Sequence, residues 1–219
     1  MTGTRLILLR HGEVASHKGD VPVTAAGIEH AERTGKALGR QLAGPILLLY
    51  GGTRRTRETA EAVARGIGDD GRITGPRDAF ALRNPDMYVA GSRVNMVSSA
   101  AALAEQVPGM TAEQAAANPW WAEFFTAPDR IGWWLGQADP PGETVTDLAG
   151  RVLRFAASLD DPGPTRGRVV VGVTHSPVLR AVLRHATGAD PGEPAYVTGA
   201  DVRVRAGGPH ITPYDPLTV

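Results

Sequence analysis

Basic and imidazole side chains stand directly behind three short apolar runs of the sequence. The pairs are Arg10-His11 after residues 6–9, Arg54-Arg55 after residues 46–49 and a glycine turn, and Thr174-His175 after residues 169–173. Each unbroken apolar run predicts a strand that is covered on both faces, as in a parallel sheet. Ligands of open parallel sheets bind outside the carboxyl ends of the strands, so these side chains should meet at one edge. Guanidinium and imidazole groups gathered there, together with helix N-termini, would form an anion site suited to a phosphoryl group.

The two histidines at this edge admit a structural, a metal-binding and a catalytic interpretation. A single histidine behind a strand is more often structural, but the joint pattern of three strand ends favours chemistry. A metal site needs further ligands, and no carboxylate or histidine lies at a recognisable ligand spacing from His11 or His175. Arg10 and Arg55 would also repel a cation. We therefore expect a nucleophile or proton carrier, with no metal and no other cofactor.

The composition narrows the range of partners. The 219 residues contain 23 Lys and Arg against 23 Asp and Glu, so no net charge attracts the chain to nucleic acid or to a membrane surface. The expected partner is a small phosphorylated molecule, and a homodimer is compatible with the sequence. Cysteine is absent, which excludes a thiolate nucleophile and disulfides. The first apolar run is too short for a signal peptide or a membrane span, so we expect a cytoplasmic protein.

Helical patterns separate the apolar runs. Residues 26–42 carry apolar side chains near helical spacing, with Thr24 as the expected N-cap, and residues 56–64 and 144–159 predict further helices. Strands that alternate with helices predict a three-layer α/β/α sandwich with a mainly parallel sheet, as one domain over residues 1–219. Residues 202–204 predict a last strand, and residues 212–219 a weakly ordered tail.

The stretch at about 84–141 interrupts the alternation and predicts an inserted helical cap. It should contain a helix over residues 92–106 and a second helix that opens with a capping box at Thr111 and Gln114. All four tryptophans lie in this stretch. They could line an apolar substrate pocket, with Trp133 as the candidate, or form the core of the cap itself, which we favour.

Five segments of the sequence, taken in order, form a set of motifs. They are Leu8-Leu9-Arg10-His11-Gly12-Glu13, Pro22-Val23-Thr24-Ala25-Ala26-Gly27, Arg54-Arg55-Thr56-Arg57-Glu58-Thr59-Ala60-Glu61, Pro141-Gly142-Glu143-Thr144 and Val173-Thr174-His175-Ser176-Pro177-Val178-Leu179-Arg180. In this order they resemble the motifs of the histidine phosphatase superfamily, whose fold is also called phosphoglycerate mutase-like. Together they cover roughly residues 5–65 and 140–185. The tripeptide at 10–12 alone would be a weak indication, whereas five ordered segments are a strong one.

The resemblance implies a role for each residue of the anion site. His11 would attack phosphorus and become a transient phosphohistidine, while Arg10, Arg55 and His175 would hold the phosphoryl oxygens. Phosphoryl transfer needs an in-line nucleophile and fixed positive donors, so the residue types agree with these roles. Further contacts to the substrate are expected from Gly12, Glu13, His17, Thr174 and Trp133.

The proton donor is the point at which the sequence departs from the family pattern. Most members carry a glutamate as general acid some two dozen residues after the arginine that begins the helix, and residues 77–86 contain none. We expect Asp86 to take this role because Asn84 and Pro85 place it in a turn, with Asp78 as the other nearby carboxylate.

The expected function is that of a metal-independent phosphatase that hydrolyses a small phosphate ester through His11. A mutase is less favoured. Without the glutamate, three accounts remain open. A different carboxylate supplies the proton, the substrate has a leaving group that needs none, or the anion site serves another reaction or only binds a phosphorylated ligand.

Overall fold

The structure is a computed structural model that describes residues 4–16, 19–68, 71–205 and 207–218. Its centre is a six-stranded sheet with the order β3-β2-β6-β1-β7-β8. The strands are β1 (Arg5–Arg10), β2 (Ile46–Tyr50), β3 (Ile73–Asp78), β6 (Val169–Thr174), β7 (Gly199–Arg205) and β8 (Gly208–Tyr214). The first four in spatial order are parallel to one another, and β7 and β8 add an antiparallel edge. The sheet is therefore mainly parallel, as the unbroken apolar runs predicted.

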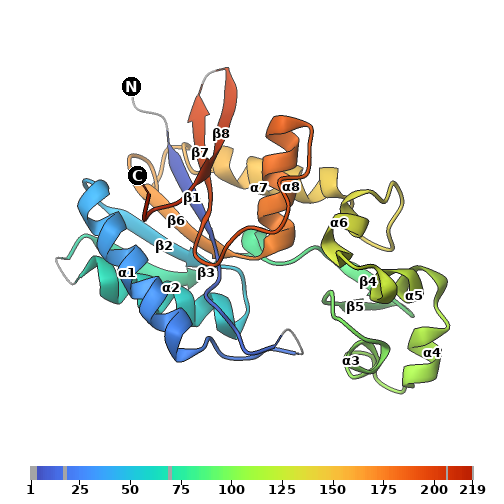
Figure 1. Cartoon of the computed structure of the whole chain (residues 1–219). Helices are drawn as coiled ribbons and strands as arrows, with labels where there is room; N and C mark the ends of the chain where they lie inside the picture. Colours follow the sequence, from blue (N-terminus) through green and yellow to red (C-terminus); the bar gives the residue numbers. More distant parts are fainter. Residues whose placement is uncertain (1–3, 17–18, 69–70, 206, 219) are drawn as a thin grey trace.

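Two pairs of helices cover the sheet (Figure 1). They are α1 (Ala25–Gln41) and α2 (Arg54–Ile67) on one face, and α7 (Val145–Ser158) and α8 (Ser176–Thr187) on the other. Alternate residues of β1 belong to different cores: Ile7 packs with α1 and α2, while Leu8 packs with α7 and α8. Because successive side chains of a strand point to opposite faces, one apolar strand supplies both layers. The predicted three-layer α/β/α sandwich is confirmed.

Threonine N-caps fix where three of these helices begin. The side chain of Thr24 accepts a hydrogen bond from Gly27, and Thr53 and Thr144 form capping boxes with the third residue of α2 and α7. Such caps satisfy backbone N–H groups that have no partner within the helix. The cap at Thr53 sets the start of α2, and with it the position of Arg55.

The segment between β3 and α7 folds into short elements. The first, η1 (Phe80–Leu82), packs against the sheet, where the Leu82 carbonyl accepts a hydrogen bond from Thr174 at the end of β6. The others lie to one side of the sheet (Figure 1): the hairpin β4 (Met87–Val89) and β5 (Ser92–Val94), and the helices α3 (Ala100–Ala104), α4 (Ala112–Ala116), α5 (Pro119–Thr126) and α6 (Arg130–Leu135). We call the elements from β4 to α6 the cap. Trp121 and Phe124 are fully buried in it, and the ring of Trp120 stacks on that of Phe124 at a centroid distance of 5.4 Å. The aromatic residues thus form the core of the cap.

Three expectations about the elements were wrong or incomplete. The helix predicted over residues 92–106 begins only at Ala100, because Ala90 and Gly91 adopt positive φ and turn the chain so that β5 pairs with β4. The supposed tail contains the end of β8, which pairs with β7. Strand β3 was missed because its sequence contains Gly75 and Pro76, which an edge strand tolerates.

No helix in the described parts of the chain is long and apolar enough to cross a membrane.

Candidate active site

His11 lies at the carboxyl end of β1 and is almost completely buried. Its Nδ1 atom lies 2.8 Å from the carbonyl oxygen of Gly12. A carbonyl oxygen can only accept a hydrogen bond, so Nδ1 carries the ring hydrogen, and in the neutral ring the lone pair is on Nε2. A histidine in this tautomer is prepared to act as a nucleophile through Nε2.

The loop after β1 is held close to α1 and α2. The Gly12 amide donates to Thr59 Oγ1 at 2.8 Å, and this hydroxyl in turn donates to the Arg55 carbonyl at 2.7 Å. A Cβ atom at position 12 would lie 2.9 Å from Val23 Cγ1 and 3.1 Å from the Gly27 carbonyl oxygen. Only glycine fits this approach without displacement, and the fit fixes the backbone that carries His11.

Arg10 precedes His11 and is buried against the loop between α8 and β7. Its guanidinium donates to the Pro194 carbonyl at 2.5 Å, pairs with Glu193 at 2.7 Å and lies 4.2 Å from the centroid of the Tyr196 ring. These contacts leave little freedom for the side chain, so its charge is fixed beside His11.

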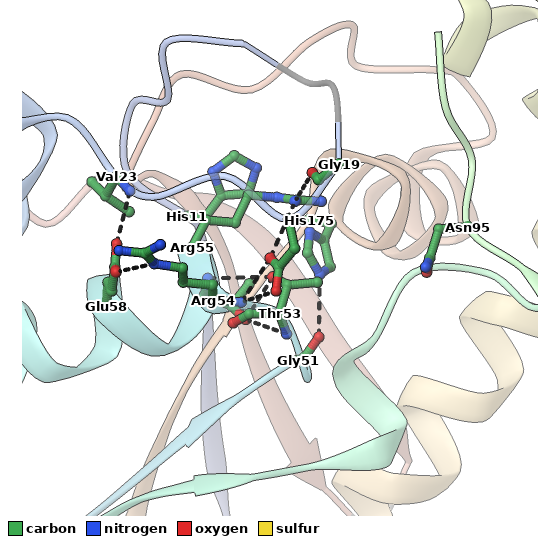
Figure 2. A network of polar contacts seen from close by, with 12 residues as sticks. His11, Gly19, Val23, Gly51, Thr53, Arg54, Arg55, Glu58, Asn95 and His175 are labelled. Carbon is green, nitrogen blue, oxygen red and sulfur yellow. Dashed lines mark hydrogen bonds and ion pairs between the residues drawn. The ribbon is translucent and has the colours of Figure 1, made fainter. Parts of the chain in front are cut away.

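Arg55 enters the site from the first turn of α2 (Figure 2). Its side chain is 13% exposed, and the nearest carboxylate oxygen, that of Asp20, lies 3.9 Å away. Burial lowers the pKa of Arg55, an effect that Asp20 partly offsets and Arg10 reinforces. Its neighbours on the helix, Arg54 and Arg57, are half-exposed and face Glu58 and Glu61 instead. Of these arginines, Arg55 alone lines the site.

His175 completes the cluster from the end of β6 (Figure 2). Its ring centroid lies 5.7 Å from that of His11, and its Nε2 atom lies 3.2 Å from the Gly51 carbonyl oxygen. Burial holds the pKa of His175 well below its ordinary value, and the nearby Arg55 and His11 act in the same direction. The ring is therefore neutral near pH 7.

Buried nitrogen atoms without a hydrogen-bond partner in the structure point to an anionic ligand. Among the described residues they include Nε of Arg10, Nε of Arg55 and Nδ1 of His175. Buried polar groups are normally satisfied, so the two guanidinium N–H groups mark the place where ligand oxygens would be bound. The hydrogen of the neutral His175 ring lies on Nε2, which faces the Gly51 carbonyl oxygen, so its Nδ1 can only accept a hydrogen bond.

A pocket of about 250 Å³ opens above this cluster. Its floor is formed by the four residues already described, and its walls add apolar and charged side chains from the cap and from the loop between α8 and β7. The wall residues include Asn84, Met96, Val97, Phe124, Asp129, Arg130, Ile131 and Glu193. The walls come mostly from the cap, so the cap shapes the space above the anion site.

The family model of the histidine phosphatase superfamily (branch 1) matches residues 6–75 and 98–205, most of the chain. The chain belongs to the histidine phosphatase superfamily. No curated protein sequence matches the chain significantly. The unmatched gap at 76–97 contains η1 and the β4–β5 hairpin, the stretch in which the expected glutamate is missing.

Solved structures of two phosphatases share the fold at low sequence identity. A mycobacterial glucosyl-3-phosphoglycerate phosphatase in complex with VO3 is 18% identical with a TM-score of 0.61, over 96% of this chain and 97% of that one. A variant of phosphoserine phosphatase from Entamoeba histolytica in complex with phosphoserine is 15% identical with a TM-score of 0.59, over 95% of both chains. At this level of identity the likeness shows the fold.

Several expected residues of this superfamily member lie away from the pocket floor. Glu13 accepts a hydrogen bond from the hydroxyl of Thr24 at 2.9 Å, and the hydroxyl of Thr174 donates to the Leu82 carbonyl at 2.5 Å. Trp133 packs against Trp120 in the core of the cap, with ring centroids 5.0 Å apart. These three side chains serve structural contacts. His17 lies outside the described residues.

Asp86 does not reach the pocket. Its carboxylate pairs with Arg83 at 2.5 Å and with Arg93, both of which lie outside the pocket lining. Burial raises the pKa of the Asp86 carboxyl, but the hydrogen bonds from Arg83 and Arg93 outweigh it and hold the pKa below its usual value. A carboxylate held ionised in this way is poorly suited to deliver a proton, which corrects the expectation drawn from its turn.

The pocket also contains residues that the sequence did not single out. Asn84 stands in the segment where a glutamate was expected, and its amide can donate a hydrogen bond but cannot transfer a proton. Asp129 and Glu193 are the carboxylates of the pocket lining, and they come from the cap and from the loop after α8. Nothing in their local sequence marks them, because both reach the pocket only through the tertiary fold.

The described residues contain no group of three or more His, Asp or Glu side chains placed to hold a metal ion.

Proposed function

We propose that this protein is a phosphatase that hydrolyses a small-molecule phosphate ester through a phosphohistidine on His11, without a metal ion. The proposal rests on one observation above all. His11, with its Nδ1 hydrogen donated to the Gly12 carbonyl, lies in a pocket between two fixed guanidinium groups and a second histidine. A phosphoryl group in transfer is stabilised by fixed positive donors, here the guanidinium groups of Arg10 and Arg55.

The first step would join His11 Nε2 to phosphorus while the bond from phosphorus to the ester oxygen breaks. Arg10 and Arg55 would hold the non-bridging oxygens and offset the charge that develops on them. In the second step, water would attack the phosphohistidine, break the P–N bond and release phosphate. The named phosphatases among the solved structures support this reading by fold, and the substrate of this chain is left to experiment.

The test is phosphate release from a panel of phosphate esters in the presence of a metal chelator. We expect release by the unaltered protein and a loss of at least about 10³-fold in His11→Ala, because the nucleophile is removed. His185→Ala is the matched control, since His185 is exposed on the last turn of α8. An acid-labile phosphoryl group on the protein, absent from His11→Ala, should be detected after rapid quenching.

Two outcomes would contradict the proposal. Full turnover by His11→Ala would exclude His11 as the nucleophile. Absence of release from every ester, with inorganic phosphate still bound, would favour another reaction or a purely binding role for the same anion site.

A further inference from the structure

Hydrolysis of an ordinary ester requires a proton for the leaving oxygen. Among the residues that the structure describes, two carboxyl groups of the pocket lining could supply it. These are Asp129 at the start of α6 and Glu193 in the loop between α8 and β7. The inference below rests on the proposed function, because it concerns the leaving group of that reaction. The contacts of the two carboxylates separate their roles.

Asp129 is bound on both oxygens by a cation that the substrate cannot reach. Arg180 Nη1 and Nη2 lie 2.9 Å and 2.7 Å from its two carboxylate oxygens, and the Arg180 side chain is only 1% exposed. The hydrogen bonds from Arg180 lower the pKa of Asp129 to about 2. This pair persists whether or not the anion site is filled, so Asp129 stays ionised during turnover.

Glu193 is bound instead by the cation that would receive the phosphoryl group. Its Oε1 atom lies 2.7 Å from Arg10 Nη2, and its Oε2 atom accepts a hydrogen bond from Ser176 Oγ at 2.5 Å. Arg10 precedes His11 and Ser176 follows His175 in the sequence, so the carboxylate sits between the two loops that carry the histidines. It is half-exposed and lines the pocket.

A phosphate dianion would take over part of the Arg10 charge that Glu193 pairs with, whereas Arg180 keeps both oxygens of Asp129. The dianion would share Arg10 and place negative charge next to Glu193, which favours the protonated carboxyl. The other charged groups nearby do not replace Arg10. Arg180 Nη1 is 3.6 Å from Glu193 and already donates to Asp129, while Arg180 Nε donates to Asp190. Glu193 is therefore the pocket carboxyl group whose cation partner is shared with the bound ester.

We propose that Glu193 is the proton donor to the leaving oxygen of the ester. As the bond from His11 Nε2 to phosphorus forms and the P–O bond breaks, the electron pair of that bond takes the proton from the Glu193 carboxyl, and the alcohol leaves. The resulting carboxylate regains its proton from solvent after the alcohol has left, and the water that then attacks the phosphohistidine releases its proton to solvent. Ser176 donates to Oε2, so the proton is carried by Oε1, the oxygen whose partner Arg10 is shared with the ester.

The test compares two esters that differ in their need for a proton, phenyl phosphate and dinitrophenyl phosphate. Dinitrophenolate leaves without protonation, whereas phenolate does not. We expect Glu193→Gln to lower kcat for phenyl phosphate by about 10²- to 10³-fold and kcat for dinitrophenyl phosphate by less than about tenfold. Inorganic phosphate should inhibit Glu193→Gln at least as well as the unaltered protein, because a carboxylate that competes for Arg10 is removed.

Matched variants test whether another carboxylate is the proton donor. Asp129→Asn makes the same chemical change at the other carboxylate of the pocket, and Asp86→Asn makes it outside the pocket. Neither substitution should alter the ratio of kcat for phenyl phosphate to kcat for dinitrophenyl phosphate. Glu193→Asp keeps the carboxyl group but shortens its reach. Its kcat for phenyl phosphate should therefore lie between that of Glu193→Gln and that of the unaltered protein. It provides the same comparison if Glu193→Gln does not fold.

Equal losses on both esters in Glu193→Gln, or a loss confined to phenyl phosphate in Asp129→Asn, would overturn the assignment of Glu193. Either result would leave the proposed function intact. Retention of turnover by His11→Ala would instead remove the proposed function itself, whatever the behaviour of Glu193→Gln.

Discussion

At the scale of single residues, His175 links the anion site to stability. Its pKa is held well below the ordinary value of 6.5 by burial, and by Arg55 and His11 beside it. The unfolded chain therefore binds a proton below about pH 6.5 that the folded chain does not, and stability is lost as the pH falls through that range. The loss cannot exceed about 1.4 kcal/mol per pH unit for one group.

This prediction is checked by urea unfolding between about pH 8 and 5. The free energy of unfolding should fall on acidification, and it should fall less in His175→Gln, whose side chain does not take up a proton. His185→Gln, an exposed change in the same helix, should retain the slope of the unaltered protein. Parallel slopes for all three proteins would show that His175 does not dominate this pH range.

The sequence could predict the floor of the pocket but not its walls. Arg10, His11 and His175 directly follow apolar strands, so the rule for parallel sheets places them together before any coordinates are known. The choice of Arg55 over its neighbours depends on the rotation of α2, which the cap at Thr53 sets. The prediction that Asp86 is the proton donor was wrong for a different reason. Arg83 and Arg93 bind its carboxylate, and they are brought to it by a turn and a hairpin that the sequence did not indicate.

At the scale of elements, two glycines bring α1 and α2 into close contact. A Cβ atom at Gly66 would lie 2.1 Å from the Glu32 carbonyl oxygen and 2.9 Å from Gly35 Cα. Helix propensity alone would favour alanine at an interior helical position by about 1 kcal/mol. The clash is with backbone atoms, which cannot move aside without separating the helices. The loss of packing should therefore exceed the gain in helix propensity.

We therefore expect Gly66→Ala to destabilise the protein by about 1–3 kcal/mol. Gly150 in α7 is the matched control, since a Cβ atom there would meet only the mobile end of the Arg154 side chain. Gly150→Ala should be neutral or stabilising by up to about 1 kcal/mol. Thermal unfolding measures both, and equal effects of the two substitutions would contradict the packing argument.

The elements themselves were predictable where a single pattern covers a whole element. Strands β1, β2 and β6 are unbroken apolar runs. Helices α1, α2 and α7 carry apolar side chains at helical spacing and have clear N-caps. The antiparallel strand β8 owes its formation to its partner β7, and the β4–β5 hairpin to the positive φ angles at Ala90 and Gly91. Such pairings depend on partners or turn geometry that a local apolar pattern does not encode.

At the scale of the whole molecule, the cap is joined to the sandwich by an ion pair next to the pocket. Asp129 begins α6 of the cap, and Arg180 lies in α8, where it also binds Asp190. Because Arg180 is buried, its charge needs these carboxylates in the folded state. The pair therefore positions the cap over the anion site and with it the wall formed by Phe124 and Ile131.

Neutralising Asp129 should loosen the cap and leave the sandwich intact. In Asp129→Asn we expect faster amide hydrogen exchange over residues 119–135 and unchanged exchange in α1, together with a higher KM for bulky esters. Glu123→Gln removes an exposed carboxylate of the same cap and should change neither the exchange rates nor KM.

Because the pKa of Asp129 is lowered to about 2 from 3.8, acid should also loosen the cap of the unaltered protein as the pH falls from about 4 towards 2. If exchange rises equally in α1 and in the cap, the substitution has destabilised the whole fold, and the ion pair is not a local tie between cap and sandwich.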